Sequence, residues 1–358
     1  MKLLVSALEP SSNLHLREVL KHIDSHDDNF ELLGIFDKRI DKGRPLYDIS
    51  QMAIMGVVDA LKKLPWFFKV ADEMVTLAKE ADKVLLMDSS GFNLPLAKKL
   101  KTAYPDKEII YYILPQVWAS RPKRVEKLER YCDRLLGILP FETDYYPGGK
   151  AEYVGHPLLD EITVERMGED RRNIITFMPG SRPSEIKRLM PVFWELRRKM
   201  GNDIRPLLVI PPHFSRQQIA RLYRGNREFE IVRNSHEALR RSDFAFICSG
   251  TATLEAALIG TPFTLAYIAK RLDFFIGTKL LGIKQVGLAN IILSRHNGTT
   301  LHNELLQEDV TVDNLLREYY NTDRAKFAAK AKELKEYLGH GSSENVAKII
   351  MRDKERRC

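Results

Sequence analysis

Residues 177–185 (FMPGSRPSE) place glycine, hydroxyl and arginine side chains directly after an apolar run. Gly180 would let the backbone approach a ligand closely, and Ser181 would precede a helix with Pro183 in its first turn. A helix N-terminus attracts phosphate, and the guanidinium of Arg182 matches phosphate oxygens. The pattern indicates a phosphate site, although an ordinary helix cap with a surface arginine would use the same residues.

A second apolar run ends in CSGTATLE, residues 248–255. Its small residues, on which a pyrophosphate could rest, are Ser249, Gly250 and Thr251. Glu255 would lie one helical turn further on, where a carboxylate can accept hydrogen bonds from ribose hydroxyls. The alternative is a capping box, but that motif needs serine or threonine three residues before the glutamate, and this position is Ala252.

Asp88 is the candidate base. It follows the apolar run VLLM at residues 84–87 and would lie at the end of a strand, where it could take a proton from a hydroxyl nucleophile. A local turn stabilised by the same side chain is the alternative. Residues 114–124 (LPQVWASRPKR) add an aromatic ring and three cations, which suit a sugar or an anion, or a solvated helix start.

Residues 57–70 (VVDALKKLPWFFKV) interleave bulky apolar residues with lysines. Such a helix can lie in a membrane interface with its lysines near anionic headgroups, each contributing about 1 kcal/mol. A helix packed on a sheet is the alternative. Because Trp66, Phe67 and Phe68 are consecutive, they cannot all face one core, and the interfacial interpretation stays open.

The elements that would position these side chains alternate between strand and helix patterns. The predicted strands are residues 2–7, 30–36, 83–87, 108–113, 135–139, 152–154, 173–178, 206–210, 229–232, 244–248 and 263–266. Helical periodicity occupies residues 13–23, 58–79, 94–103, 122–131, 184–200, 215–223, 236–240, 253–259, 323–338 and 343–354. This alternation predicts an α/β fold with parallel sheets, in which ligands bind beyond the carboxyl ends of the strands.

The pattern restarts after a charged stretch at residues 160–172. We therefore expect two Rossmann-like domains facing across a cleft, residues 1–163 and residues 172–325. Helices at residues 326–358 would follow and could cross back to the first domain.

The composition is that of a globular protein. The 358 residues hold 56 basic and 48 acidic side chains, a net charge of +8, and 44% are hydrophobic, which excludes collagen-like, disordered and disulfide-scaffold classes. Three cysteines with no CxxC pair predict neither a disulfide framework nor a zinc ribbon. No apolar run reaches the ~20 residues that span a bilayer, and MKLLVSALEP lacks the features of a signal peptide.

Histidine spacing gives only weak signals. His22 and His26 are four residues apart at the polar end of a helix, which favours a solvated face over a metal site. His156 in GHP is interpreted as a structural residue. The sequence holds no GxGxxG, P-loop, GxSxG or HExxH motif.

Together these stretches resemble the lipid-A-disaccharide synthases, a glycosyltransferase family of Gram-negative bacteria. The matching segments, in family order over about residues 1–295, are MGVVDALKKLP (55–65), DSSGFNLPLAKKLK (88–101), YYILPQVWASRPKR (111–124), ILPFE (138–142), VGHPLLD (154–160), MPGSRPSEIKRLMP (178–191) and SGTATLE (249–255), with Asn290 in GLANIIL. Two loops depart from the family: its GExSGD is LEPSSN here (8–13), and its PDFN is SGFN (90–93).

The resemblance implies the glycosyltransferase-B fold and an inverting reaction. UDP-2,3-diacylglucosamine and 2,3-diacylglucosamine 1-phosphate would form a β-1,6-linked disaccharide 1-phosphate and UDP. It implies no cofactor and no metal, and no nucleic-acid partner. The enzyme would be cytoplasmic and peripheral on the inner membrane, at its cytoplasmic leaflet, with a homodimer left open.

The resemblance also implies roles for particular residues. Asp88 would be the base, with Glu9 orienting it or sharing the role. The donor-binding residues would be Gly180, Ser181, Arg182, Glu185, Ser249, Gly250, Thr251, Ala252, Glu255 and Asn290. The acceptor- or lipid-binding residues would be Ser11, Met55, Val57, Val58, Leu61, Trp66, Phe67, Gln116, Trp118 and Arg121.

Two other functions remain as alternatives. One is an enzyme like UDP-N-acetylglucosamine 2-epimerase, which shares a two-domain architecture but needs neither a lipid surface nor an acceptor site. The other is a relative that binds UDP without turnover.

Overall fold

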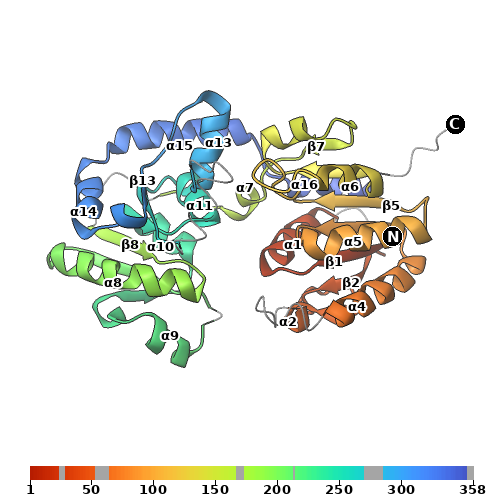
Figure 1. Ribbon diagram of the computed structural model, residues 1–358, viewed down its shortest axis with the longest axis horizontal. Helices are drawn as coiled ribbons and strands as arrows, with labels where there is room; N and C mark the ends of the chain where they lie inside the picture. The colour runs from red at the N-terminus through yellow and green to blue at the C-terminus, as the bar shows by residue number, and fades with distance from the viewer. Residues whose placement is uncertain (24–28, 53–63, 167–172, 213, 270–284, 353–358) are drawn as a thin grey trace. The chain divides into compact units, whose positions relative to one another are not determined.

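Two α/β units make up the chain, each built on its own parallel sheet (Figure 1). The structure is a computed structural model that describes residues 1–23, 29–52, 64–166, 173–212, 214–269 and 285–352. The first unit comprises Met1–Glu161 and His340–Cys358, and the second comprises Ile162–Gly339. No helix in the described ranges has the length and apolar character needed to cross a bilayer.

The first unit has a seven-stranded sheet in the order β3-β2-β1-β4-β5-β6-β7. The strands are β1 (Lys2–Ala7), β2 (Glu31–Phe36), β3 (Tyr47–Asp48), β4 (Lys83–Met87), β5 (Glu108–Tyr112), β6 (Arg134–Gly137) and β7 (Ala151–Tyr153). All neighbours pair in parallel. The residues of β4 and β5 are buried throughout, as helices on both faces of a parallel sheet require.

Helices cover both faces of this sheet. They are α1 (Pro10–Ile23), α2 (Ile49–Met52), α4 (Leu64–Leu77), α5 (Ser90–Ala103), α6 (Arg124–Tyr131), α7 (Leu158–Glu161) and α16 (Ser343–Met351), with 3-10 turns η1 (Ala78–Glu80) and η2 (Pro140–Tyr145). Successive strand residues face opposite sides, so Leu4 packs in the core with α4 and α5. Val5 packs in the core with α1 and α16.

The second unit has a six-stranded sheet in the order β10-β9-β8-β11-β12-β13. The strands are β8 (Ile174–Met178), β9 (Arg205–Val209), β10 (Glu230–Val232), β11 (Phe244–Ile247), β12 (Phe263–Tyr267) and β13 (Glu304–Leu306). The helices are α8 (Pro183–Lys199), α9 (Arg216–Leu222), α10 (Ser235–Arg241), α11 (Thr251–Ile259), α13 (Leu288–Asn297), α14 (Val312–Asn321) and α15 (Arg324–Leu338), with 3-10 turns η3 (Asn226–Glu228) and η5 (Gln307–Asp309).

Each sheet has a switch point, a pair of neighbouring strands from which the chain winds outward in both directions. The pair is β1 and β4 in the first unit and β8 and β11 in the second. Ala7 pairs with Met87, and Met178 pairs with Ile247, so the loops after the paired strands begin side by side. Ligands of open α/β sheets bind at such points.

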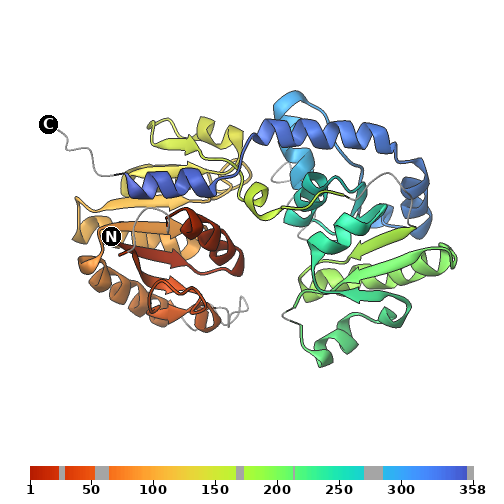
Figure 2. The same ribbon diagram turned by 180° about the vertical axis from the view of Figure 1, so that it is seen from behind.

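The predicted strands all occur, and the structure adds elements that periodicity did not indicate. These are the strands β3 and β13 and the helices α2, α7, α13 and α14, of which β3 and β13 have only two and three residues. Residues 58–63, the start of the predicted helix at 58–79, lie outside the described residues. At the C-terminus, α15 belongs to the second unit, whereas α16 packs on α1 in the first (Figure 2).

Candidate active site

Asp88 lies in a strained turn that neighbouring side chains hold in place. Asp88 and the residue after it have φ of 48° and 37°, the left-handed region that costs non-glycine residues of order 1–3 kcal/mol each. Asn93 of α5 donates through Nδ2 to the carbonyl oxygens of Met87 (2.9 Å) and Asp88 (3.1 Å). The Tyr111 hydroxyl donates to the Asp88 carbonyl as well, and Oδ1 of Asn93 accepts from the hydroxyl of Ser6 in β1 at 2.6 Å. The turn is thereby tied to β1 and β5.

Asn13 of α1 holds the turn after β1 through hydrogen bonds to its backbone. Its Nδ2 donates to the carbonyl oxygens of Ala7 (2.8 Å) and Glu9 (2.9 Å), and its Oδ1 accepts the N–H of Asp37 after β2 at 2.7 Å. This position is aspartate in the family loop that the sequence resembles. Only an amide can donate to the two carbonyls, so the substitution fits the contacts of this chain.

The Asp88 carboxyl is half-buried. Burial raises its pKa, while the backbone N–H of Ser89 and the charge of His15 act in the opposite direction. A perturbed carboxyl at a switch point has the properties of a general base. Glu9 and Ser11, after the neighbouring strand β1, are exposed.

Glu142 organises the loop after β6, against which the loop with the predicted acceptor residues packs through Trp118. Its Oε2 accepts the N–H groups of Ile138 and Leu139, both at 3.0 Å, and the Trp118 side chain acts to lower the pKa of its carboxyl. Burial raises the pKa of Glu142 to about 7. The Trp118 ring packs edge-on against Phe141 with centroids 5.5 Å apart. The other predicted residues of the Trp118 loop, both exposed, are Gln116 and Arg121.

The aromatic triplet of α4 divides between core and surface. Trp66 and Phe67 pack against the core of the first unit, in an aromatic series that runs from Tyr47 to Phe92. Phe68 is 51% exposed. The three rings therefore do not share one core, as expected, but the exposed one is the residue that the predicted lipid-binding set omits. Four members of that set lie outside the described residues: Met55, Val57, Val58 and Leu61.

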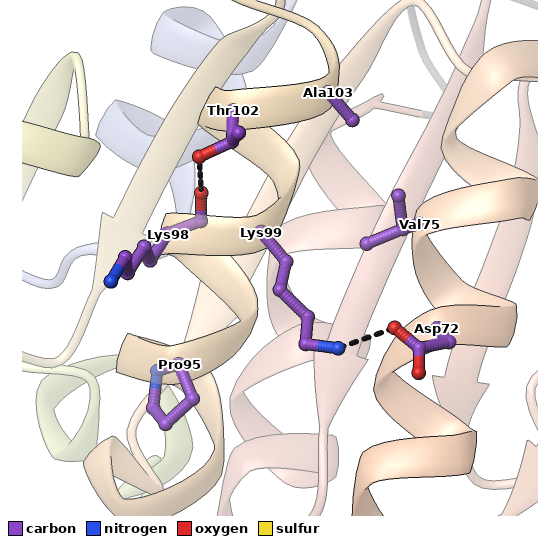
Figure 3. Close-up of a pocket in the computed structure, with 7 residues that line it drawn as sticks. All are labelled: Asp72, Val75, Pro95, Lys98, Lys99, Thr102 and Ala103. Carbon is purple, nitrogen blue, oxygen red and sulfur yellow. Dashed lines mark hydrogen bonds and ion pairs between the residues drawn. The ribbon is translucent and has the colours of Figure 1, made fainter.

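A pocket of about 520 Å³ opens between α4 and α5 (Figure 3). It is lined by Asp72, Val75, Pro95, Lys98, Lys99, Thr102 and Ala103. Lys99 pairs with Asp72, and its ammonium lies 5.9 Å from the centre of the Phe68 ring. Lys98 points away from that ion pair. None of the predicted site residues lines this pocket, so it is a surface feature beside the exposed ring of α4.

In the second unit, the turn after β8 requires glycine. Gly180 has φ of 107°, and a Cβ there would lie 2.5 Å from Oε2 of Glu185. Glu185 is buried, and it accepts the Arg182 N–H at 3.3 Å through Oε2 and the Arg182 guanidinium at 3.0 Å through Oε1. The Arg182 side chain is still 76% exposed. Glu185 therefore shapes the turn and orients an arginine that remains accessible to an anion.

The turn after β11 leaves the start of α11 open. Gly250 has φ of 111°, and no atom lies within 4 Å of the place where its Cβ would be. Among the described residues no side chain caps α11, so its first turn keeps backbone N–H groups for an anion. Thr253 donates to the Gly250 carbonyl (2.9 Å) and accepts the Leu288 N–H (3.1 Å), which ties this turn to the segment before α13. Ser249, Thr251 and Ala252 lie in the same turn and are partly or fully exposed.

Glu255 and Asn290 differ in burial and in how their polar atoms are hydrogen-bonded. Glu255 is partly buried one turn into α11 and accepts from the Ser235 hydroxyl at 3.2 Å. Asn290 is buried, and its Nδ2 donates to the His302 carbonyl and to Glu304, each at 2.9 Å. Its Oδ1 accepts the N–H groups of residues 301 and 302. Its amide therefore bonds within the second unit, between α13 and the segment before β13.

Sequence reasoning missed the residues that hold the two turns of the first unit. Asn13 and Asn93 each lie six residues after the last residue of a strand, to whose carbonyl each donates. This repeated spacing is the signal that could have found them. The described residues contain no group of three or more His, Cys, Asp and Glu side chains suited to a metal ion.

The comparisons with known proteins cover nearly the whole chain. A family model described as "Lipid-A-disaccharide synthetase" matches residues 3–353. The lipid-A-disaccharide synthase of Helicobacter acinonychis (strain Sheeba) is 45% identical over 359 residues, 97% of each chain. This match outweighs the epimerase alternative.

The solved structures show the fold. MurG of Acinetobacter baumannii gives a TM-score of 0.58 at 13% identity, and each chain is covered to 98%. The UDP-GlcNAc 2-epimerase of Neisseria meningitidis, bound to UDP-GlcNAc, gives 0.60 at 11% identity with the same coverage. Two parallel-sheet α/β units of the glycosyltransferase-B class, together with the full-length family match, show that the chain belongs to the lipid-A-disaccharide synthase family of glycosyltransferases.

Proposed function

We propose that the chain transfers diacylglucosamine from UDP-2,3-diacylglucosamine to 2,3-diacylglucosamine 1-phosphate. The products are the β-1,6-linked disaccharide 1-phosphate and UDP, with inversion at the anomeric carbon. The observation that supports this most directly is the Asp88 carboxyl, half-buried in a strained turn at the switch point of the first unit, in a chain of this family.

In the proposed reaction, the primary hydroxyl of the acceptor attacks the anomeric carbon from the face opposite UDP. The bond between that carbon and the UDP oxygen breaks, and the hydroxyl proton passes to Asp88. Negative charge develops on the departing diphosphate. The open N-terminus of α11, the turn before α8 and the Arg182 guanidinium would stabilise that charge without reorganising.

The predicted donor-site residues form two groups: those that would contact the UDP-sugar and those that would hold the contacting residues in position. Gly180, Ser181, Ser249, Gly250 and Thr251 would line the diphosphate, with Ala252 beside them. Glu255 would accept from the ribose hydroxyls. Glu185 and Asn290 would act as positioning residues, because their side chains bond within the second unit.

Both substrates carry acyl chains, so we propose a cytoplasmic enzyme that binds the surface of the inner membrane. On α4, the exposed Phe68 is followed by Lys69, whose side chain is also exposed. The pocket next to Phe68 adds Lys98 and Lys99. An apolar ring among lysines suits an anionic interface, and a net charge of +8 adds attraction at longer range.

Replacement of Asp88 tests the proposal. The purified protein is assayed with both acylated sugars, and UDP binding is measured by calorimetry. Asp88→Asn should lower kcat by about 10²–10⁴-fold with UDP affinity unchanged. The matched control is Asp82→Asn at the opposite end of β4, where the carboxylate accepts the Lys2 N–H at 2.7 Å, and it should keep the parent's activity.

Other results would point elsewhere. Full activity of Asp88→Asn would remove Asp88 as the base and leave Glu9 as the candidate. UDP binding by the parent with no turnover would show a binding relative that has lost catalysis.

A further inference from the structure

Ser235 and His236, the first two residues of α10, contact the carboxylate of Glu255 on α11. The Ser235 hydroxyl donates to Oε2 of Glu255 at 3.2 Å, and Nε2 of His236 lies 3.5 Å from the same oxygen. The side chains of His236 and Glu255 are 25% and 16% exposed. Ser235 and Glu255 are 20 positions apart in the sequence, and the packing of α10 beside α11 brings them together.

The other oxygen of this carboxylate has no protein partner. Both contacts fall on Oε2, and in the described part of the chain no hydrogen bond or ion pair engages Oε1. Two other carboxylates of the second unit differ in this respect. Glu185 bonds to Arg182 through both oxygens, and Glu304 accepts the N–H groups of residues 286 and 287 through its two oxygens. Of these three carboxylates, Glu255 is the one that keeps an acceptor atom for a ligand.

The fold fixes α10 at both ends. At its start, the Asn234 side chain accepts the Glu237 N–H at 3.0 Å. Near its end, the hydroxyl of Thr261 donates to the Leu239 carbonyl at 2.8 Å. The N–H of Thr261 donates in turn to the Ala256 carbonyl of α11 at 2.9 Å. The first residues of α10 are therefore held against α11 by a fixed backbone.

Glu255 lies at the place where the ribose of a bound nucleoside diphosphate would follow the diphosphate. The turn after β11 leaves the first turn of α11 open to an anion, and Glu255 lies one turn further along the same helix. Ribose offers two neighbouring hydroxyl donors, and one carboxylate oxygen has two lone pairs to accept them. A carboxylate that is already held in place loses less side-chain entropy when the ligand binds.

We propose that Ser235 and His236 are positioning residues of the donor site, which hold Oε2 of Glu255 so that Oε1 accepts the ribose hydroxyls of the UDP-sugar. This inference rests on the proposed function, in which Glu255 binds the ribose. It adds that α10, together with α11, determines how strongly the site prefers a nucleotide that carries both hydroxyls.

The test compares the affinities of UDP and 2′,3′-dideoxy-UDP, both measured by titration calorimetry. The parent should bind UDP about tenfold more tightly, because hydrogen bonds to a charged group strengthen binding by that order. Glu255→Ala should abolish this preference. Ser235→Ala should weaken UDP binding about threefold through the lost preorganisation, with the affinity for 2′,3′-dideoxy-UDP unchanged.

Three further variants make the result specific. Ser235→Thr keeps the hydroxyl and should retain the parent's preference for UDP. His236→Ala should lower the preference as Ser235→Ala does. The matched control is Glu237→Gln on the same helix, because the Glu237 carboxylate pairs with Arg240 instead, and it should leave the affinities for both nucleotides unchanged.

Equal weakening of both nucleotides by Ser235→Ala would overturn the inference and show that α10 only supports the fold. An unchanged preference in both Ser235→Ala and His236→Ala would overturn it as well. A parent that binds the two nucleotides equally would overturn the inference and leave the transfer reaction standing. A parent that binds neither would refute the proposed function and this inference with it. If Ser235→Ala does not fold, His236→Ala and Ser235→Thr decide the question.

Discussion

At the scale of single residues, Gly180 links the backbone of the donor turn to binding. Its positive φ excludes most side chains, and Glu185 occupies the space that a Cβ would need. Because Glu185 also orients Arg182, a methyl group at Gly180 would displace both the turn and the guanidinium. The same residue thus contributes to stability and to the phosphate site.

Gly180→Ala should therefore cost more than backbone strain. The control is Gly298→Ala, which has φ of 75° and open space around the new Cβ, and it should cost about 1 kcal/mol. Gly180→Ala should cost about 1–3 kcal/mol more from the clash and should weaken UDP binding. Thermal unfolding and titration calorimetry with UDP check this. Equal stability losses with intact UDP binding would mean that Glu185 moves aside freely.

At the scale of elements, α4 combines an inner and an outer aromatic face. Trp66 and Phe67 belong to the aromatic series packed on the sheet, with Trp66 5.6 Å from Tyr47 in an edge-on pair. Phe68 faces solvent. Substitutions at Trp66 or Phe67 would change stability and lipid binding together, so Phe68 is the cleaner probe of the surface.

Phe68→Ser should weaken binding to vesicles that contain anionic lipid by about tenfold, from the loss of buried apolar area at the interface. Binding of the parent should fall as salt is raised, because the surrounding lysines are screened. Vesicle sedimentation measures both. The control is Tyr320→Ser, an equally drastic change at a ring that is 68% exposed on the second unit. If the Phe68 and Tyr320 variants bind alike, the membrane contact lies elsewhere on the molecule.

At the scale of the whole molecule, the chain completes its first unit with its last helix. Val346 and Ile350 of α16 are fully buried against α1 and β1. The ammonium of Lys83, at the start of β4, donates to the carbonyl of Ile350 at 2.8 Å. One face of the sheet that carries Asp88 therefore stays partly uncovered until residues far along the chain have packed onto it.

Ile350→Ala should destabilise the first unit by about 2–5 kcal/mol through the cavity it leaves. Hydrogen exchange should show the loss in α1, β1 and β4, with the second unit's sheet unaffected. The control is Lys348→Ala on the exposed side of the same helix, which removes only a surface pair with Glu344 and should change stability by less than about 1 kcal/mol. Loss of protection in the second unit as well would show that the two units unfold together.

Much of the architecture could be predicted from short runs of residues. Aliphatic stretches such as residues 83–87 and 244–248 indicate buried parallel strands, and the Gly180 and Gly250 turns indicate phosphate sites from residue types alone. The strand predictions are confirmed, and the phosphate sites stay predictions. Both rest on local physics, because side-chain polarity, glycine conformations and helix N-termini act within a few residues. The two-residue β3 is too short to leave a periodic signal.

Contacts across strands and between distant helices came only from the tertiary structure. The strand order puts the Asp88 turn beside the end of β1, and Asn13 and Asn93 join the turns through buried hydrogen bonds. The tertiary structure also brings Asn290 into hydrogen-bonding distance of the His302 carbonyl, and it places His15 against Glu161. Such partners are chosen by which groups become buried together, and burial depends on how the whole chain packs rather than on any one segment.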